Sequence, residues 1–301
     1  MKRLINIATF YFSIILLLFS GCVTVEETLY LREAEVSGPL TTAPIHLTDS
    51  TDTPSITFSP RFSYSTKNTL IGDIKQRSEL YELDTTFVPS ENSLTWNIAT
   101  VNAGLDMDLV LSKSFAIFFG INYSSQNNFK AWGGNFGIGL FGYGNGTAFR
   151  LDIGMQLHSM QYNAYTVVRT RTSSLFGGED EFIGFFQDVG KSTHLDPYFS
   201  LTYNTAFKTW PVNLFFNAGF SVQTLFSFTP RSSYHSFGFF RTTDLRGSST
   251  AGFINFTPGI YFFLGKSNRV LLGSRFYLET QIDGADPSLF ILPMIQLDFR
   301  L

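Results

Sequence analysis

The stretch SLFILPMIQLDFRL, from Ser288 to Leu301, has the most regular pattern in the chain. Its apolar residues recur at every second position, at Leu289, Ile291, Pro293, Ile295, Leu297, Phe299 and Leu301. Because successive side chains of a β-strand point to opposite faces, this pattern predicts a strand with one apolar face. The opposite face begins apolar and ends with Gln296, Asp298 and Arg300. The chain therefore ends in a strand whose two faces meet different surroundings.

A terminal strand of this kind, with an aromatic residue near its end, resembles the closing strand of bacterial outer-membrane β-barrels. The usual last residue in that family is Phe, whereas this chain has Leu301 and places Phe299 two positions earlier. In the family, the barrel assembly machinery recognises the last strand. The resemblance therefore implies an outer-membrane location, contact with membrane lipid, and this machinery as a partner of Ser288 to Leu301.

The composition agrees with strands that are apolar on one side only. Phe accounts for 34 of the 301 residues and Gly for 25. Charged residues make up 15%, against roughly 25% in a typical soluble domain. After the leader, no apolar run approaches the roughly 18 residues that a membrane-spanning helix needs. The formal net charge of −3 disfavours nucleic acid as a partner, because nucleic-acid binding calls for a basic face.

The first residues have the layout of a secretory signal peptide. Lys2 and Arg3 precede a mostly apolar stretch over residues 4–19, and a small-small-Cys ending follows at Cys22. This ending resembles a bacterial lipobox, which implies that residues 1–21 are removed and that Cys22 is acylated. The alternative is an ordinary signal peptide that happens to contain a cysteine. Cys22 is the only cysteine, so no disulfide can form within the chain.

The remaining chain divides into a linker and a barrel. Residues 22–54 end in a run rich in Ser, Thr, Asp and Pro, which predicts a periplasmic linker after the lipidated cysteine. Ten strands are predicted over residues 56–64, 92–111, 115–123, 132–140, 149–157, 195–207, 212–228, 254–264, 270–282 and 288–301. The alternation slips by one position near Ala99 and Thr100, which suggests a β-bulge in the second strand.

The connections between these strands alternate in length. Tight turns at residues 112–113, 144–146, 208–210 and 265–267 alternate with longer links, the longest over residues 160–192. Short turns on one side and long loops on the other are typical of an outer-membrane barrel. We therefore expect residues 55–301 to form an all-β, antiparallel, up-and-down transmembrane barrel of about ten strands. Within the longest loop, residues 162–171 and 181–187 are expected to pair as a protruding hairpin.

Charged residues on the polar strand faces are expected to point into the lumen. An unpaired buried charge is costly, so these residues should form a paired network that fills the barrel. Its candidate members are Asp106, Asp108, Arg150, Asp152, His158, Arg275 and Glu279. A proton or ion path is the functional alternative. Ten strands lie closer to the eight-stranded barrels that side chains fill than to open porins, which leaves a narrow channel as the transport alternative.

One enzyme family offers a direct comparison. Omptin proteases are ten-stranded barrels of similar length, with a pair of acidic residues that faces an Asp–His pair at the extracellular rim. Here His194 and Asp196 would share a face at the outer end of a strand, whereas Asp106 and Asp108 would lie near the periplasmic end of another. No catalytic residue, metal ligand or cofactor is therefore predicted. We expect a structural role or the binding of an extracellular ligand by the loops, with an omptin-like protease as the less favoured alternative.

Overall fold

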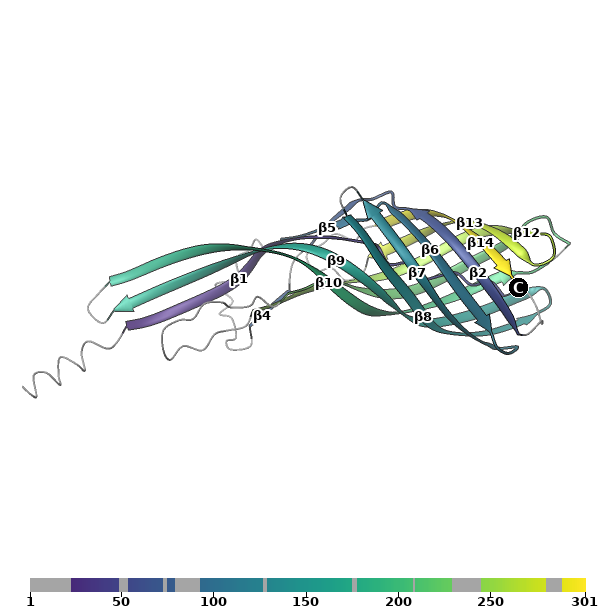
Figure 1. The fold of residues 1–301 in the computed structure, drawn as a ribbon, viewed down its shortest axis with the longest axis horizontal. Coiled ribbons are helices and arrows are strands. Elements are labelled where there is room, and N and C mark those ends of the chain that lie inside the picture. The colour runs from purple at the N-terminus through teal and green to yellow at the C-terminus, as the bar shows by residue number, and fades with distance from the viewer. Residues whose placement is uncertain are drawn as a thin grey trace, which may run out of the picture.

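A computed structural model describes residues 23–48, 54–72, 75–78, 93–126, 129–174, 178–207, 209–228, 245–279 and 289–301. Ten of its strands form the wall of a barrel (Figure 1). They are β2 (Ser55–Tyr64), β6 (Val101–Val110), β7 (Phe115–Gln126), β8 (Phe129–Gly144), β9 (Thr147–Ser174), β10 (Gly178–Thr205), β11 (Asn213–Phe228), β12 (Leu245–Leu264), β13 (Asn268–Glu279) and β14 (Leu289–Arg300). No helix in the described ranges has the length and hydropathy that a membrane-crossing helix needs.

The barrel is closed and antiparallel throughout. Each wall strand pairs with the next along the chain, and β14 returns to pair with β2. Leu301 and Ile56 exchange two backbone hydrogen bonds, of 2.9 and 3.3 Å, beyond that pairing. The predicted ten-stranded, up-and-down barrel is therefore confirmed, and the terminal strand is the one that closes it.

The outer surface of the wall is a belt of exposed apolar side chains. The alternating residues that face outward include Ile56, Phe62, Leu105, Phe119, Ile121, Phe136, Ile138, Ile153, Leu157, Phe199, Leu201, Leu214, Phe216, Ile254, Phe256, Leu272 and Ile295. In water, an apolar surface of this extent would be unstable, because it would remain in contact with solvent. Around a closed barrel with a polar interior, it is the lipid-facing band of a membrane protein. The chain is therefore an outer-membrane β-barrel.

A charge placed on this belt should be costly. Ile153 of β9 is 48% exposed and lies between Ile138 and Phe199 on the neighbouring strands. Ile153→Arg is expected to lower the free energy of unfolding in lipid vesicles by about 2–4 kcal/mol, as arginine does near the bilayer midplane. The matched control is Ile183→Arg on β10, beyond the belt, where Ile183 is 50% exposed; a change within about 0.5 kcal/mol is expected there. Equal losses at the two positions would contradict the assignment of the belt.

Two of the wall strands extend far beyond the others. β9 pairs with β8 only as far as Leu157, but it pairs with β10 along its whole length as far as Ser174. The predicted hairpin is thus confirmed, and residues 161–174 of β9 alone span roughly 45 Å. β1 (Val23–Gly38) pairs with this extension, from Val23 opposite Ser174 to Ser37 opposite Gln161. We call the protruding part of β9 and β10, together with β1, the arm (Figure 1).

The second predicted strand is two strands with different roles. β5 (Ser93–Ile98) leaves the wall and pairs with β1 and with β3 (Thr69–Gly72), whereas β6 stays in the barrel. The slip in alternation near Ala99 and Thr100 is therefore the break between two strands and not a bulge. Backbone hydrogen bonds from Ile98 to Asn68 and from Ala99 to Gly38 turn the chain away from the wall at this point. A further short strand, β4 (Lys75–Ser78), pairs with β12.

Strands β1, β5 and β3 form an amphipathic cap over the end of the barrel where the long loops lie. The apolar face of the cap packs on the inner surface of the wall at the end with the long loops. This buried cluster contains Leu31, Ala34, Val36, Leu70, Leu94, Trp96 and Ile98 from the cap, and Leu225, Phe226, Ala251, Phe253, Tyr277, Phe290 and Leu292 from the wall. The Trp96 ring lies 6.1 Å from that of Phe253. The opposite face of the cap is polar, with Asn97 donating a 2.7 Å hydrogen bond to Glu35.

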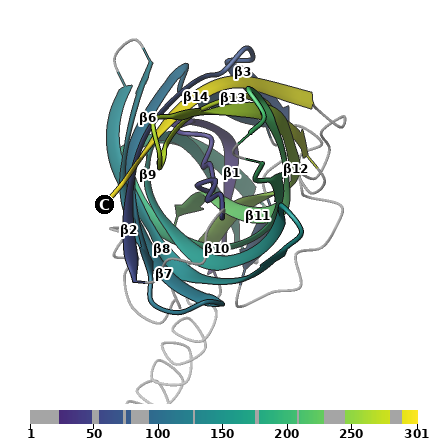
Figure 2. The ribbon, with the colours of Figure 1, turned by 90° about the vertical axis from the view of Figure 1, so that its right-hand side faces the viewer.

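The structure departs from the periplasmic linker expected over residues 22–54. Residues 23–38 form β1 on the side of the long loops, and residues 39–48 run down the inside of the barrel. Figure 2 shows this part of the chain, in purple, inside the ring of strands. Residues 49–53, which make up most of the run that predicted a linker, lie outside the described residues, and Pro39 and Pro44 favour an extended backbone within residues 39–48. The predicted signal peptide and Cys22 lie outside the described residues.

Candidate functional site

The most distinctive feature of the interior is the chain that occupies it. Residues 39–48, which we call the lumen segment, are buried along their whole length. The segment enters at the end with the long loops, where Thr41 contacts Gln223 near the top of β11. It leaves at the end with the tight turns, where Thr48 contacts Asn204 near the end of β10. The lumen is therefore filled from one end to the other.

The wall binds the lumen segment through its backbone. Five side chains of β11, β13 and β14 donate hydrogen bonds to every second carbonyl oxygen of the segment. Gln223 Nε2 donates to Pro39 (2.6 Å), Tyr277 Oη to Thr41 (3.1 Å), Arg275 Nη1 to Ala43 (2.7 Å), Gln296 Nε2 to Ile45 (2.8 Å) and Arg269 Nη1 to Leu47 (3.2 Å). A period of two is that of an extended chain, so one side of the wall acts as a row of donors for a strand-like peptide.

Side chains of the lumen segment reach other strands of the wall. Arg61 Nη1 of β2 donates to the Thr42 hydroxyl at 2.5 Å. His46 Nδ1 lies 3.1 Å from Asp152 Oδ2 of β9, with both side chains buried. These contacts hold the segment from two sides. They also give hydrogen-bond partners to polar wall residues that would otherwise be buried without one.

Asp106, Asp108 and Asp152 of the interior are paired with arginines. Arg150 donates two 2.7 Å hydrogen bonds to Asp108 and a third to Asp152. Arg61 donates at 2.6 Å to Asp106, which also accepts from Asn135. Such bidentate, charge-assisted contacts are among the stronger hydrogen bonds in proteins. The charges therefore offset one another within a rigid wall.

The predicted network residues are all buried, but they belong to separate groups. Asp108, Arg150 and Asp152 form one cluster, Asp106 lies with Arg61, and Arg275 holds the lumen segment. Glu279 is buried at the upper end of β13. Arg61, Arg269 and the lumen segment are not among the residues predicted from the sequence. The signal of Arg61 is weak because it is the only charged residue of β2, whereas Arg269 stands at the start of β13, which also carries Arg275 and Glu279.

His158 lies in a third group, near the end of the wall with the long loops. Its Nε2 is 3.5 Å from Asp196 and donates a 3.0 Å hydrogen bond to the Thr224 carbonyl. The ring of His194 lies 5.7 Å from that of His158. Asp196 accepts hydrogen bonds from both the backbone N–H and the hydroxyl of Thr224, at 2.6 and 2.8 Å. This carboxylate therefore tethers β10 to β11 above the point where their ladder begins.

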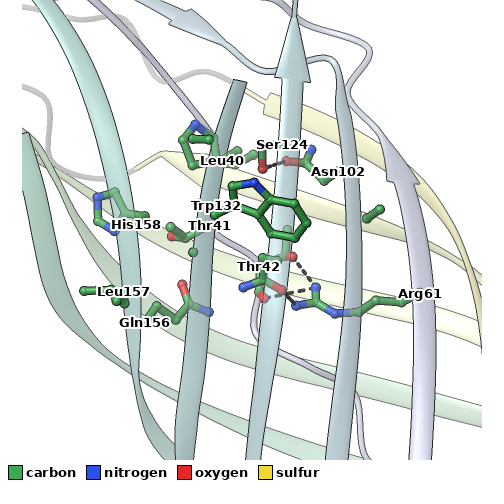
Figure 3. Close-up of a pocket in the computed structure, with 15 residues that line it drawn as sticks. Leu40, Thr41, Thr42, Arg61, Asn102, Ser124, Trp132, Gln156, Leu157 and His158 are labelled. Carbon is green, nitrogen blue, oxygen red and sulfur yellow. Dashed lines mark hydrogen bonds between the residues drawn. The ribbon is translucent and has the colours of Figure 1, made fainter. Parts of the chain in front are cut away.

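A small cavity lies between the lumen segment and the wall strands β2 and β6 to β9 (Figure 3). Its labelled polar residues include Thr41, Arg61, Asn102, Gln156 and His158. Within the described part of the chain, Asn102 Nδ2, Gln156 Nε2 and His158 Nδ1 are buried without a hydrogen-bond partner. These atoms give the cavity polar groups on three of its sides. Among the described residues, no group of three or more His, Cys, Asp or Glu side chains could hold a metal ion.

Comparison with known proteins gives similarity in fold only. No protein-family model matches the chain, and no curated protein matches its sequence. Similar solved structures include the outer membrane protease OmpT from Escherichia coli, at 10% identity and a TM-score of 0.39, covering 85% of this chain and 99% of that one. The beta domain of the Bordetella autotransporter BrkA has 13% identity and a TM-score of 0.38, covering 82% and 98%. LpxR from Salmonella typhimurium has 10% identity and a TM-score of 0.28, covering 80% and 99%.

Proposed function

We propose that this barrel is a closed membrane anchor that holds the arm and the cap at the cell surface, where the arm binds a partner or a surface. The observation that supports this most strongly is the lumen segment, which fills the barrel from end to end. The buried cluster under the cap covers the same passage at its outer end. A barrel that is filled and covered is poorly suited to passing solutes, which leaves the extramembrane part as the place for activity.

The arm has the exposed side chains that a binding surface needs. On the outward face of β10, the apolar belt ends at Leu195, and polar Thr193 and Lys191 follow. Beyond them, Val189 and Phe185 are 71% and 68% exposed. Next to them, Gln187 donates hydrogen bonds to Asn163 and Tyr165 across the strand pair. Exposed apolar groups beside ordered polar groups, outside the membrane, are typical of an interaction surface.

Shortening the arm should remove binding and leave the barrel intact. Thr166 and Phe186 lie opposite each other on β9 and β10. Residues 167–185 can therefore be replaced by Asn-Gly, which favours a tight hairpin turn. We expect cells that display the shortened chain to lose attachment to protein-coated or polysaccharide-coated surfaces, and to lose autoaggregation. The matched control is Val189→Ser with Phe185→Ser in the full-length arm, which should weaken attachment without shortening the hairpin.

The state of the barrel is checked in the same samples. A folded barrel migrates faster than the boiled protein on a detergent gel, and both variants are expected to keep this difference. Attachment that is unchanged after the arm is shortened, with the barrel folded, would contradict the proposed function.

A second candidate, a gated channel, is favoured by one observation. Side chains hold the lumen segment, and no backbone ladder is described for residues 39–48. Such contacts can be exchanged for water more readily than a ladder built into the wall. The protease alternative has no comparable support, because the hydrogen bonds of Asp196 go to Thr224, and Asp106 and Asp108 are bound to arginines.

A further inference from the structure

The two ends of the barrel lie on one side of the membrane. Ser55 starts β2 opposite Val110, which precedes the tight turn to β7, and Leu301 lies beside Ile56. Tight turns are periplasmic and long loops extracellular in outer-membrane barrels, so both ends of the barrel face the periplasm. Val23, however, pairs with Ser174 near the tip of the arm, on the opposite side.

Among the described residues between Val23 and Ser55, the lumen segment has the length and position needed to connect these two locations. Ten residues in extended conformation reach about 33–36 Å, which is enough to cross a hydrocarbon layer of about 30 Å. Pro39 and Pro44 favour an extended backbone at the residues before them and carry no N–H that would need a partner. The hydrogen bonds from the wall run in chain order, from Gln223 near the loops to Asn204 near the turns.

A route outside the barrel would leave these backbone groups in lipid, where each unsatisfied group costs several kcal/mol. We propose that the chain crosses the outer membrane twice in two different ways. The wall crosses it as strands, and residues 39–48 cross it inside the barrel as an extended segment. In the described part of the chain, β1, which precedes Pro39, then lies at the cell surface.

The donor row explains how the wall can hold such a segment. Gln223, Tyr277 and Arg275 contact carbonyl oxygens, which every residue has, and not the side chains that differ between residues. Because the closed ladder leaves no side entrance, the segment enters either before β14 pairs with β2 or through an end of the barrel. Any acyl group attached at Cys22, the residue before Val23, would be carried at the outer side of the membrane.

Labelling of intact cells with a membrane-impermeant maleimide tests this topology directly. Three variants that each add one cysteine are compared with the wild-type chain, whose only thiol is Cys22 and which sets the baseline. Glu33→Cys reports on β1, Val189→Cys on the loop side and Lys113→Cys on the turn side, and all three positions are exposed. We expect Glu33→Cys and Val189→Cys to react on intact cells, and Lys113→Cys to react only after the outer membrane is permeabilised.

Two results would overturn the proposal. If Glu33→Cys shares the protection of Lys113→Cys while Val189→Cys reacts on intact cells, β1 lies in the periplasm, and the lumen segment does not cross the membrane. If Lys113→Cys reacts on intact cells and Val189→Cys does not, the barrel is inserted in the opposite sense, and the N-terminal part is not at the surface. The first result would overturn this proposal and leave the hairpin of β9 and β10 at the cell surface. The second would overturn the proposed function as well, because it would place the arm in the periplasm, so the two failures can be told apart.

Discussion

Arg150→Met is expected to lower the free energy of unfolding by about 3–5 kcal/mol, the range found when one partner of a buried ion pair is removed. Arg150 is buried and donates hydrogen bonds to both Asp108 and Asp152. Without the guanidinium, two carboxylates are left close together in the interior with few donors. Denaturant unfolding in lipid vesicles, followed by the shift between folded and unfolded bands, measures the loss.

The triple variant Arg150→Met, Asp108→Asn, Asp152→Asn separates charge from packing. It removes the two carboxylates that the arginine neutralises, and most of the lost stability should return. Lys113→Met, in an exposed turn, serves as the control for removal of a positive charge, and a change within about 0.5 kcal/mol is expected. A loss in Arg150→Met that the triple variant does not reduce would show that the cluster contributes through shape and not through charge.

Deletion of residues 23–48 is expected to turn a non-conducting barrel into a conducting one. The deletion removes both the lumen segment and the β1 part of the cap, and the donors that held the segment become exposed to water. In planar lipid bilayers the wild-type protein should give no resolvable current steps, and the deletion variant should give discrete steps. The barrel itself should remain folded, because the ladder from β2 to β14 does not include these residues.

The variant with the shortened arm is the matched control for the conductance measurement. It keeps the lumen segment and the pairs of β1 from Leu31 to Ser37, so it should stay closed. A deletion variant that is folded but carries no current would mean that wall side chains such as Phe118, Phe215 and Tyr277, together with the remaining cap strands β3 and β5, close the lumen without the segment. The lumen segment would then not be the element that closes the barrel, and the gated channel would be excluded as a function.

The wall of the barrel could be predicted because lipid on one side and a polar lumen on the other impose a strict period of two. The same rule misassigned Ser93–Ile98. Leu94, Trp96 and Ile98 alternate like lipid-facing residues, but they face the buried cluster under the cap. The available signal was length, because a predicted strand over residues 92–111 is much longer than the roughly 9–11 residues that a membrane requires.

The lumen segment could not be predicted from its own residues. Its position depends on hydrogen bonds to its backbone carbonyl oxygens, which every residue has whatever its side chain. The donors, such as Arg275 and Gln296, lie far away in the chain. The pairing of the inner charges was predictable in principle, because buried charges need partners. The specific partners were not, since Asp106 pairs with Arg61 across neighbouring strands whose register only the fold determines.

The most direct test of the account is a cross-link between the lumen segment and the wall at the turn end. Thr48 and Asn204 exchange hydrogen bonds of 3.3 and 2.9 Å. Thr48→Cys with Asn204→Cys, in a Cys22→Ser chain, leaves the introduced pair as the only thiols. Thr202→Cys with Asn217→Cys, a neighbouring pair on β10 and β11, calibrates the reaction within the wall. With a short bifunctional thiol reagent on folded protein in outer membranes, we expect both pairs to be bridged. Bridging of the wall pair alone would show that residues 39–48 do not pass through the barrel, and it would contradict the account.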